Sequence, residues 1–386
     1  MFLSTEQKAE LEATCVHLAQ AGKGISACDE STRTINPRFE KVGVEPTEER
    51  RRAYRQLLFE APGSSEFLTG AILDPETVYQ KSSTDGRTFP AVLKSLGILP
   101  GVKPSLTVYK LPGTGGETVM QGLDSLSVRA AEYRAAGCLF AKWRSPLTID
   151  TASGKPSELA IESNCRDLAR YALICQSEGL VPLVEPDVVL KGEHTLETAV
   201  EVNGRVHAAL FKAMADHDVY MEGALFKVNM VCPGKDCPVA YSVDDIATAN
   251  LLVLRRSLPV AIRSVNFLSG GQSLEACAAR LNAMNQLKQK RGACSAPWNL
   301  SFSWSACVQL PLFDLCLTED YSGDEAGFPR AAMQALYLNN LSVAASAASG
   351  THTPAPGDGD HKPAGKPKKD AAAEGESEAK KRKVAA

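Results

Sequence analysis

Eight short apolar segments constrain the fold of this 386-residue chain more than any other feature. They cover residues 24–29, 67–73, 98–103, 138–143, 181–184, 221–228, 265–268 and 300–303. The polar residues near their ends lie 29 to 45 residues apart, which leaves room for one helix and two loops between parallel strands. The spacing therefore predicts an α/β fold, a (β/α)8 TIM barrel.

Helical patterns lie before and between these segments. Apolar residues recur at helical intervals in residues 47–60, 163–178, 200–216 and 242–257. Ser4 and Gln7 have the spacing of a capping box, which predicts an N-terminal helix that ends by Gly22. An open doubly wound sheet is the alternative fold. That fold favours a glycine-rich first turn, which Cys28-Asp-Glu-Ser31 is not.

Polar or charged side chains end the apolar segments. They are Asp29, Asp74, Lys103, Lys142, Glu185, Lys227, Ser269 and Ser303. In a barrel of parallel strands, reactive groups lie at the carboxyl ends of the strands. We therefore expect these side chains to surround one site.

Lys227 lies inside the nearly continuous apolar run of the sixth segment. Burial disfavours the ammonium form and lowers the pKa of a lysine by up to about 3 to 5 units, which predicts a neutral amine near pH 7. A neutral amine is a nucleophile for carbonyl groups. The alternative is an ordinary lysine at a strand end whose ammonium reaches water.

Four motifs carry a resemblance to a known family. They are Gly24-Ile-Ser-Ala-Cys-Asp-Glu-Ser-Thr32, Phe140-Ala-Lys-Trp-Arg144, Leu183-Val-Glu-Pro186 and Phe267-Leu-Ser-Gly-Gly-Gln272. In order and spacing the chain resembles class I fructose-bisphosphate aldolases from about Thr5 to about Phe302. The resemblance implies cleavage of fructose 1,6-bisphosphate to dihydroxyacetone phosphate and glyceraldehyde 3-phosphate in glycolysis. It also implies an imine intermediate, no cofactor and a homotetramer.

The resemblance assigns the catalytic roles. Lys227 matches the lysine that forms the imine, Glu185 the acid/base glutamate, and Asp29 the aspartate at the cleaved hydroxyl. These residue types suit the reaction, because a carbanion needs a protonated imine as electron sink, a proton donor to expel water and a base at the hydroxyl. Lys142 matches a second lysine close to the first, whose charge would depress the pKa of Lys227 further.

The remaining matches concern the substrate and its phosphates. Arg144 matches a phosphate-binding arginine, and Asp187 an acid that helps to set the charge of the two lysines. Other positions align with groups that surround the phosphates, namely Ser269, Gly270 and Gly271 at the C1-phosphate and Ser31, Arg38 and Lys103. A hydroxyl and exposed backbone amides can bind phosphate oxygens. Outside such a motif, each of these residues is as well explained by a turn, a cap or a solvated surface.

A zinc-dependent aldolase would need a histidine cluster. The chain has six histidines, and none forms a ligand pair of useful spacing. Cys232 and Cys237 are also poorly spaced for zinc. We therefore expect no metal site.

The chain departs from the family pattern at several positions. Ser303-Trp-Ser-Ala306 stands where the family has Ser-Tyr-Gly-Arg, so a phosphate-binding arginine is absent, and the family's terminal tyrosine has no counterpart beyond Tyr337. Pro104-Ser-Leu-Thr107, Val228 and Pro37 replace other family residues. Two alternatives therefore stay open: a weakly active or inactive homologue acting as a binding or scaffold protein, and a Schiff-base aldolase for another sugar phosphate.

Composition limits the compartment and the partners. The formal charge of −3 indicates no nucleic acid partner for the folded part, and no apolar run is long enough for a membrane span. The N-terminus lacks the pattern of a signal peptide, and eleven scattered cysteines suggest reduced thiols. We expect a soluble cytoplasmic protein whose partner is a sugar phosphate.

The last part of the chain differs in composition. Residues 344–386 are rich in Ala, Gly, Pro, Ser and Lys and contain no aromatic residue. We predict a barrel domain over residues 1–345 and a disordered tail over 346–386, because such a segment cannot offset the entropy of ordering. Lys380-Lys-Arg-Lys-Val384 resembles a nuclear-localisation tract, although short basic clusters are also common in solvated tails.

Overall fold

Eight parallel strands form the centre of the protein. A computed structural model describes residues 3–292, 296–318 and 327–363. The strands pair in the order β1-β2-β3-β6-β7-β8-β9-β10, and every pairing is parallel. Their bounds are Gly24–Cys28 (β1), Leu68–Leu73 (β2), Leu99–Val102 (β3), Phe140–Thr148 (β6), Val181–Val189 (β7), Leu225–Asn229 (β8), Ser264–Leu268 (β9) and Asn299–Phe302 (β10). The eight predicted strands are confirmed.

The first and last strands of the sheet meet. The Ala27 amide donates to the carbonyl of Trp304 over 3.0 Å, and the Ser301 hydroxyl donates to the carbonyl of Lys23. The sheet therefore curls into a nearly closed barrel. This contact excludes the open doubly wound alternative.

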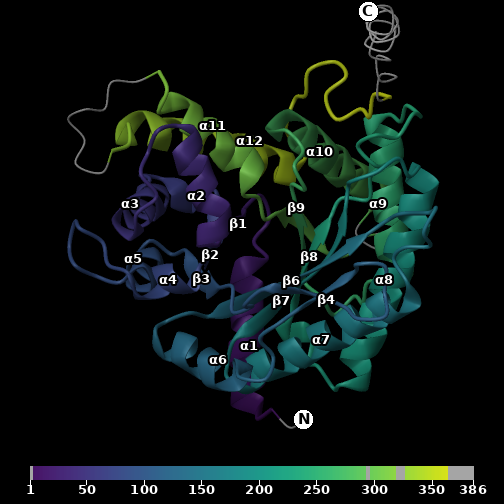
Figure 1. The fold of residues 1–386 in the computed structure, drawn as a ribbon, viewed down its shortest axis with the longest axis horizontal. Coiled ribbons are helices and arrows are strands. Elements are labelled where there is room, and N and C mark those ends of the chain that lie inside the picture. The colour runs from purple at the N-terminus through teal and green to yellow at the C-terminus, as the bar shows by residue number, and fades with distance from the viewer. Residues whose placement is uncertain (1–2, 293–295, 319–326, 364–386) are drawn as a thin grey trace, which may run out of the picture.

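Helices surround the strands, as Figure 1 shows. They are α1 (Thr5–Leu18), α2 (Thr32–Lys41), α3 (Glu48–Phe59), α4 (Pro75–Tyr79), α5 (Phe89–Ser95), α6 (Leu126–Ala135), α7 (Glu158–Ser177), α8 (Leu196–Asp216), α9 (Val243–Ser257), α10 (Leu274–Arg291), α11 (Ala306–Leu315) and α12 (Arg330–Ser349). A hairpin of β4 (Val108–Lys110) and β5 (Thr118–Met120) stands apart from the barrel sheet. None of the helices in the described ranges has the length and hydropathy of a membrane-crossing segment.

Alternate side chains along each strand face either the barrel interior or the surrounding helices. On β7, Val181 and Leu183 face the barrel interior, whereas Val184 and Val188 pack with the surrounding helices. Side chains alternate between the two faces of a strand, so Glu185 and Asp187 also point inward, nearer the carboxyl end. The barrel interior is thus apolar at one end and charged at the other.

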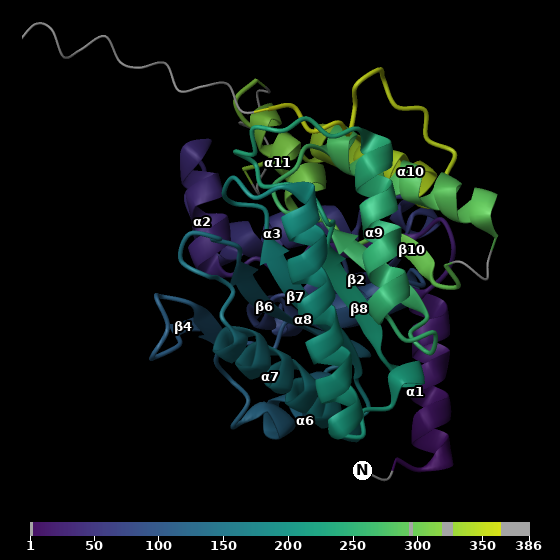
Figure 2. The same ribbon diagram turned by 90° about the vertical axis from the view of Figure 1, so that its right-hand side faces the viewer.

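The apolar end of the barrel is covered by α1. Leu11, Cys15 and Leu18 are buried and pack with Ile25 and Leu225 inside the barrel. Figures 1 and 2 both show this helix at the end of the barrel near the N-terminus. The predicted capping box of Ser4 and Gln7 is present, which confirms the start of this helix. The opposite end stays open for a site.

The strand predicted over residues 221–228 begins later. Residues Met221–Gly223 form a 3-10 turn, named η2, and β8 starts at Leu225. Gln176 of α7 donates to the carbonyls of Tyr220 and Gly223 over 2.7 and 3.1 Å. The Gln176 side chain thus binds two backbone carbonyls that could otherwise accept hydrogen bonds from a neighbouring strand. The apolar pattern alone did not reveal that competition.

The ordered chain extends beyond the predicted boundary at residue 345. Helix α12 continues to Ser349, and Ala344, Ala347 and Ala348 are buried. Alanine has no bulk to hold the helices apart, so α12 packs closely on α10, where Asn285 donates to the carbonyl of Ala347 over 3.3 Å. The composition of residues 344–349 suggested disorder, because small residues bury little area on their own.

Residues 351–363 also contact the barrel helices. The Arg280 side chain donates to the Gly359 carbonyl over 2.7 Å, and the Val243 amide donates to the Asp360 carboxylate over 2.8 Å. Tyr241 and His361 form an antiparallel bridge. Figure 1 shows this segment in yellow beside α9 and α10. The predicted basic tract of residues 380–384 lies outside the described residues.

Candidate active site

One cavity opens at the charged end of the barrel. Its volume is about 740 Å³. All twelve site residues expected from the sequence line it, namely Asp29, Ser31, Arg38, Lys103, Lys142, Arg144, Glu185, Asp187, Lys227, Ser269, Gly270 and Gly271. They come from six of the eight strands or the loops and helices that follow them. The fold therefore brings together residues that are spread along the chain from position 29 to position 271.

Two lysines share one carboxylate inside the cavity. Lys142 Nζ lies 2.6 Å from Asp29 Oδ2 and 3.3 Å from Glu185 Oε2. Lys227 Nζ lies 3.7 Å from the same Glu185 oxygen. All four side chains are at most a tenth exposed. Their charges act on one another with little screening by water.

The pKa values of the two lysines shift in opposite directions. Burial lowers the pKa of Lys227, and the nearby Lys142 ammonium adds to this effect, while Glu185 only partly opposes it. Burial would also lower the pKa of Lys142, but the carboxylates of Asp29 and Glu185 raise it above its usual value. The arrangement therefore holds the proton on Lys142 and favours a neutral amine on Lys227.

Asp29 is held in its ionised form. Burial alone would raise the pKa of its carboxyl, but the ammonium groups of Lys142 and Lys103 lower it well below its usual range. An ionised carboxylate is ready to accept a proton from a substrate hydroxyl. Its contact with Lys142 is short because the two groups are oppositely charged and buried together.

Arg144 and Asp187 form a pair at the cavity wall. Arg144 contacts the Oδ2 atom of Asp187 through Nε at 2.7 Å and Nη2 at 2.6 Å. Burial raises the pKa of the Asp187 carboxyl, and the Arg144 guanidinium offsets only part of that shift. The Arg144 side chain is 41% exposed, so it can reach a ligand that enters from solvent.

Ser269, Gly270 and Gly271 form the turn after β9. Gly270 and Gly271 have φ values of +58° and +77°, a region that favours glycine. Neither of their amides donates a hydrogen bond to any other described residue. A turn with free amides that lines a cavity can bind an anion.

Lys103, Arg38 and Ser31 follow β3 and β1 on another side of the cavity. Lys103 Nζ donates to the carbonyl of Asp29 over 2.7 Å and lies 2.9 Å from Asp74 Oδ2. Arg38 lies 2.9 Å from a carboxylate oxygen of Glu30. The two cations are thus held in place but remain partly accessible.

Sequence reasoning missed the part that Glu30 plays in this wall. Its carboxylate accepts from Arg38 and from the Ser305 hydroxyl, and lies 3.2 Å from Nη2 of the buried Arg55. Glu30 directly follows Asp29 at the end of β1, which was a usable signal. Arg55 carried none, because it lies in an arginine-rich segment typical of an exposed helix.

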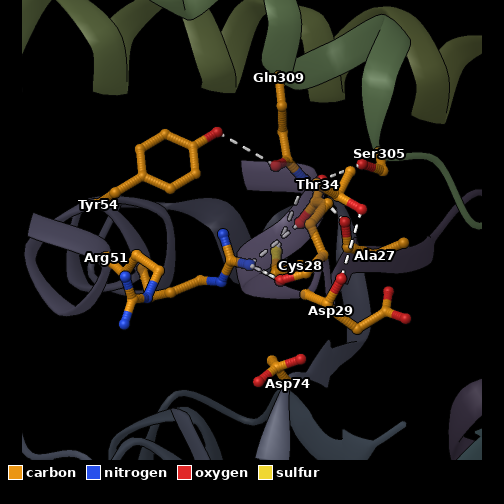
Figure 3. A network of polar contacts seen from close by, with 12 residues as sticks. Ala27, Cys28, Asp29, Thr34, Arg51, Tyr54, Asp74, Ser305 and Gln309 are labelled. Atoms are coloured by element: carbon orange, nitrogen blue, oxygen red, sulfur yellow. Dashed lines mark hydrogen bonds and ion pairs between the residues drawn. The ribbon is translucent and has the colours of Figure 1, made fainter. Parts of the chain in front are cut away.

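Helix α11 follows β10, the last strand of the barrel, and connects it to the polar contacts around Glu30 and the end of β1. Figure 3 shows Ser305 and Gln309 close to Ala27 and Cys28 at the end of β1. The Tyr54 hydroxyl points toward the Gln309 side chain. Gln309 donates to the carbonyl of Ala27 over 2.8 Å and accepts from the Tyr54 hydroxyl over 3.1 Å. Because these groups are buried and paired, they fix the start of α11 and so the place of Ala306 at the cavity.

Two departures from the family pattern have a clear location. Ala306 lines the cavity and carries no charge into it. Tyr337 is buried in α12, where its hydroxyl lies 2.6 Å from that of Ser26 on β1, and it is not among the lining residues. In the described parts of the chain, no group of three His, Cys, Asp or Glu side chains is placed to hold a metal ion.

Comparison with known proteins shows the family of this chain. Residues 10–363 match the model of the family described as fructose-bisphosphate aldolase class-I. The chain belongs to this family. It is 48% identical over 301 residues to a fructose-bisphosphate aldolase of Dictyostelium discoideum, covering 78% of this chain and 82% of that one. It is 46% identical over 308 residues to fructose-bisphosphate aldolase B of Gallus gallus, covering 80% and 82%.

A solved structure of the family has the same fold. The fructose-bisphosphate aldolase of Plasmodium falciparum, crystallised with TRAP and a small-molecule inhibitor, superposes with a TM-score of 0.86 at 38% identity. The match covers 92% of this chain and 98% of that chain. The (β/α)8 barrel is therefore the family fold, and the charged cavity occupies the end of the barrel where reactive groups are expected.

Proposed function

We propose that this aldolase family member cleaves fructose 1,6-bisphosphate to dihydroxyacetone phosphate and glyceraldehyde 3-phosphate through an imine on Lys227. One observation carries the proposal. The buried amine of Lys227 has a lowered pKa and lies 3.7 Å from Glu185, while Lys142 keeps a proton beside the same carboxylate. A neutral nucleophile, a proton donor and a fixed positive charge are the groups that imine formation requires.

Imine formation uses Lys227 and Glu185. The amine of Lys227 attacks the ketone carbon of the open-chain sugar and forms a carbinolamine. Glu185 lies within reach to transfer a proton to the departing hydroxyl, which leaves as water. The product is a protonated imine, whose nitrogen can accept an electron pair.

Carbon–carbon cleavage uses Asp29. Its carboxylate accepts the proton of the C4 hydroxyl, the C3–C4 bond breaks and its electron pair moves to the iminium nitrogen. Glyceraldehyde 3-phosphate leaves, and the enamine that remains is protonated and hydrolysed to release dihydroxyacetone phosphate. Lys142, 2.6 Å from Asp29, keeps that carboxylate ionised and oriented before the proton moves.

The two substrate phosphates fit two walls of the cavity. The free amides of Gly270 and Gly271 with the Ser269 hydroxyl suit one phosphate. Lys103, Arg38 and Ser31 suit the other, and the partly exposed Arg144 can approach from the side. A bisphosphate matches a cavity with an anion-binding group on each side.

Borohydride trapping tests the proposal. The protein is incubated with fructose 1,6-bisphosphate and borohydride, and the modified peptide is located by mass spectrometry. We expect one adduct, on Lys227, and no adduct and no cleavage in the Lys227→Met variant, whereas EDTA should change neither. An adduct on another lysine, or activity lost in EDTA and restored by zinc, would overturn the imine mechanism.

We further propose a homotetramer in the cytoplasm. Support comes from the family resemblance and from relatives of Arabidopsis thaliana that are named cytosolic. The ten described cysteines are all buried and unpaired, which suits a reducing compartment. Light scattering on the purified protein and fractionation of cells test the two statements separately.

A further inference from the structure

Lys235 lies beside the turn of Ser269, Gly270 and Gly271. It belongs to the loop between β8 and α9, and its ammonium donates to the Gly271 carbonyl over 3.4 Å. A Cβ atom at residue 271 would fall 2.9 Å from Lys235 Nζ. The ammonium therefore occupies the space that a side chain at residue 271 would fill. No sequence pattern singles out this exposed lysine.

The loop that carries Lys235 is firmly anchored. The backbone amides of Gly234, Lys235 and Asp236 donate to carbonyls of the β7–α8 loop over 2.8, 2.8 and 3.0 Å. A Cβ atom at residue 234 would overlap the carbonyl oxygen of Gly192, so the close approach of the two loops requires glycine there. The backbone of Lys235 is thus fixed, and its side chain extends over the turn.

The charge of Lys235 is unengaged, unlike the charges of most cations that line the cavity. Lys142, Arg144, Lys103 and Arg38 are each within 3.3 Å of a carboxylate oxygen. Among the described residues, no carboxylate forms an ion pair with Lys235, whose partner is a neutral carbonyl. Arg33 lines the cavity and has no such pair among the described residues, but it lies on α2 after β1. Lys235 is not among the cavity-lining residues and stands beside the turn that lines it.

We infer that Lys235 binds the substrate phosphate that rests on the turn of Ser269, Gly270 and Gly271. It supplies there the positive charge that Ala306 does not bring to the cavity. The inference rests on the proposed function, because it assumes a phosphorylated ketose in this cavity. Lys235 acts as an affinity-determining residue and takes no part in bond cleavage.

Trapping with dihydroxyacetone phosphate isolates this contact, because that molecule carries a single phosphate. We expect Lys235→Gln to raise the half-saturating concentration about five- to tenfold while the maximal extent of trapping on Lys227 stays the same. Lys235→Arg should restore most of the affinity. The effect should shrink at high salt, because Lys235 is exposed. Lys191→Gln, an exposed lysine on the neighbouring loop, is the matched control and should change nothing.

A second measurement keeps the inference separate from the imine chemistry. Binding of inorganic phosphate, followed by phosphorus NMR, should weaken in Lys235→Gln and not in Lys191→Gln. Equal phosphate binding and equal half-saturation in all three proteins would overturn the role of Lys235. Absence of trapping in the unaltered protein, with phosphate binding still sensitive to Lys235, would instead count against the proposed function.

Discussion

Lys142 and Lys227 reach the same carboxylate from the two strands that flank β7, yet their environments shift their pKa values in opposite directions. Lys142 has two carboxylates as partners within 3.3 Å, whereas Lys227 has only the more distant edge of Glu185. Burial penalises both ammonium groups, and only Lys142 is compensated. At the residue scale, the same cavity thus raises the pKa of one lysine side chain and lowers the pKa of the other.

Removing the two lysines one at a time should therefore change the free energy of unfolding in opposite directions. The folded pKa of Lys227 lies below its unfolded value, so the unfolded state binds more protons in the window between them, and stability rises with pH there. Lys227→Met removes that penalty, so we expect a gain in stability at pH 7 that shrinks as the pH approaches about 10.4. Urea unfolding at pH 7 and pH 9 measures it.

Lys142→Met is the matched comparison. The folded pKa of Lys142 is raised, so its contribution is fully present below the unfolded pKa and is lost only as the pH rises through the folded value. Its removal leaves Asp29 and Glu185 buried without their cation, at a cost of about 3–5 kcal/mol. A loss of stability in both variants at pH 7 would contradict the lowered pKa of Lys227.

Substitutions at Asp29 and Glu185 should slow different steps of the reaction. Asp29→Asn should still form the imine and trap substrate but cleave it slowly, because the base acts after the imine exists. Glu185→Gln should slow imine formation itself. Rapid-quench trapping compared with steady-state turnover separates the two steps. If both variants lose trapping and turnover to the same degree, the cavity has collapsed and neither role is supported.

Ala306 offers a test by gain of function. A hydrogen bond to a charged group contributes roughly 1.5–3 kcal/mol, so the missing arginine should cost about 10- to 150-fold in kcat/KM unless another cation substitutes. We expect Ala306→Arg to raise kcat/KM for the bisphosphate at least several-fold, with most of the gain lost at high salt. Steady-state kinetics at two ionic strengths decide this. No gain, alongside robust activity of the unaltered protein, would mean that Lys235 or another cation already suffices.

At the scale of elements, each strand contributes an apolar half and a polar half to the barrel interior. Phe140 fills the apolar part of the interior from β6, where Lys142 follows on the same face. The large ring fits because glycines face it, and a Cβ atom at residue 101 of β3 would overlap the Phe140 ring. The apolar packing around Phe140 thus lies directly next to the charged side chains of the cavity.

Two glycine-to-alanine substitutions distinguish the effect of packing in the barrel interior from the effect of helix propensity. Gly101→Ala should destabilise the protein by about 1–3 kcal/mol, because the added methyl group overpacks the interior against Phe140. Gly204→Ala in α8 meets no atom within 4 Å and should stabilise by about 0.5–1 kcal/mol, because alanine favours the helix. Urea midpoints compare them. Equal effects of the two changes would show that the interior is not closely packed around Phe140.

At the scale of the whole molecule, elements distant in sequence cover the barrel. Helix α1 covers the apolar end, and α12 packs on α3, α10 and α11, with its Tyr337 reaching Ser26 of β1. Residues 351–363 then run back to α9 and α10. The C-terminal part of the described chain therefore stabilises the barrel from outside and leaves the cavity open.

Two truncations measure that contribution. Ending the chain after residue 350 removes the partners of Arg280, Val243 and Tyr241 and leaves the buried Arg280 side chain without the Gly359 carbonyl. After the gain in chain entropy, we expect a loss of about 1–3 kcal/mol relative to a chain that ends after residue 363. Differential scanning calorimetry compares the two. Identical melting temperatures would show that residues 351–363 add nothing to the fold.

The strands and the polar residues at their ends were predictable from the sequence. Alternation of side chains along a strand is a local property, so runs such as residues 181–184 and 265–268 predicted strands without knowledge of their neighbours. Because parallel strands of a barrel all end at one rim, the polar residues after them were expected to share a site. Seven of the eight line the cavity, whereas Asp74 pairs with Lys103 and does not line it. The order of residues along the chain thus placed Lys227, Glu185 and Asp29 at one site, and the family resemblance supplied their predicted roles.

Which groups pair, and which of the last described residues pack on the barrel, depends on contacts in three dimensions. The contact of Glu30 with Ser305 joins positions 275 residues apart, and no local pattern carries such information. The placement of Lys235 over Gly271 depends on two loops that approach through glycine. The burial of Ala347 depends on a neighbouring helix that composition cannot show. Pairing energies depend on distance and burial in three dimensions, and these exist only after the chain has folded.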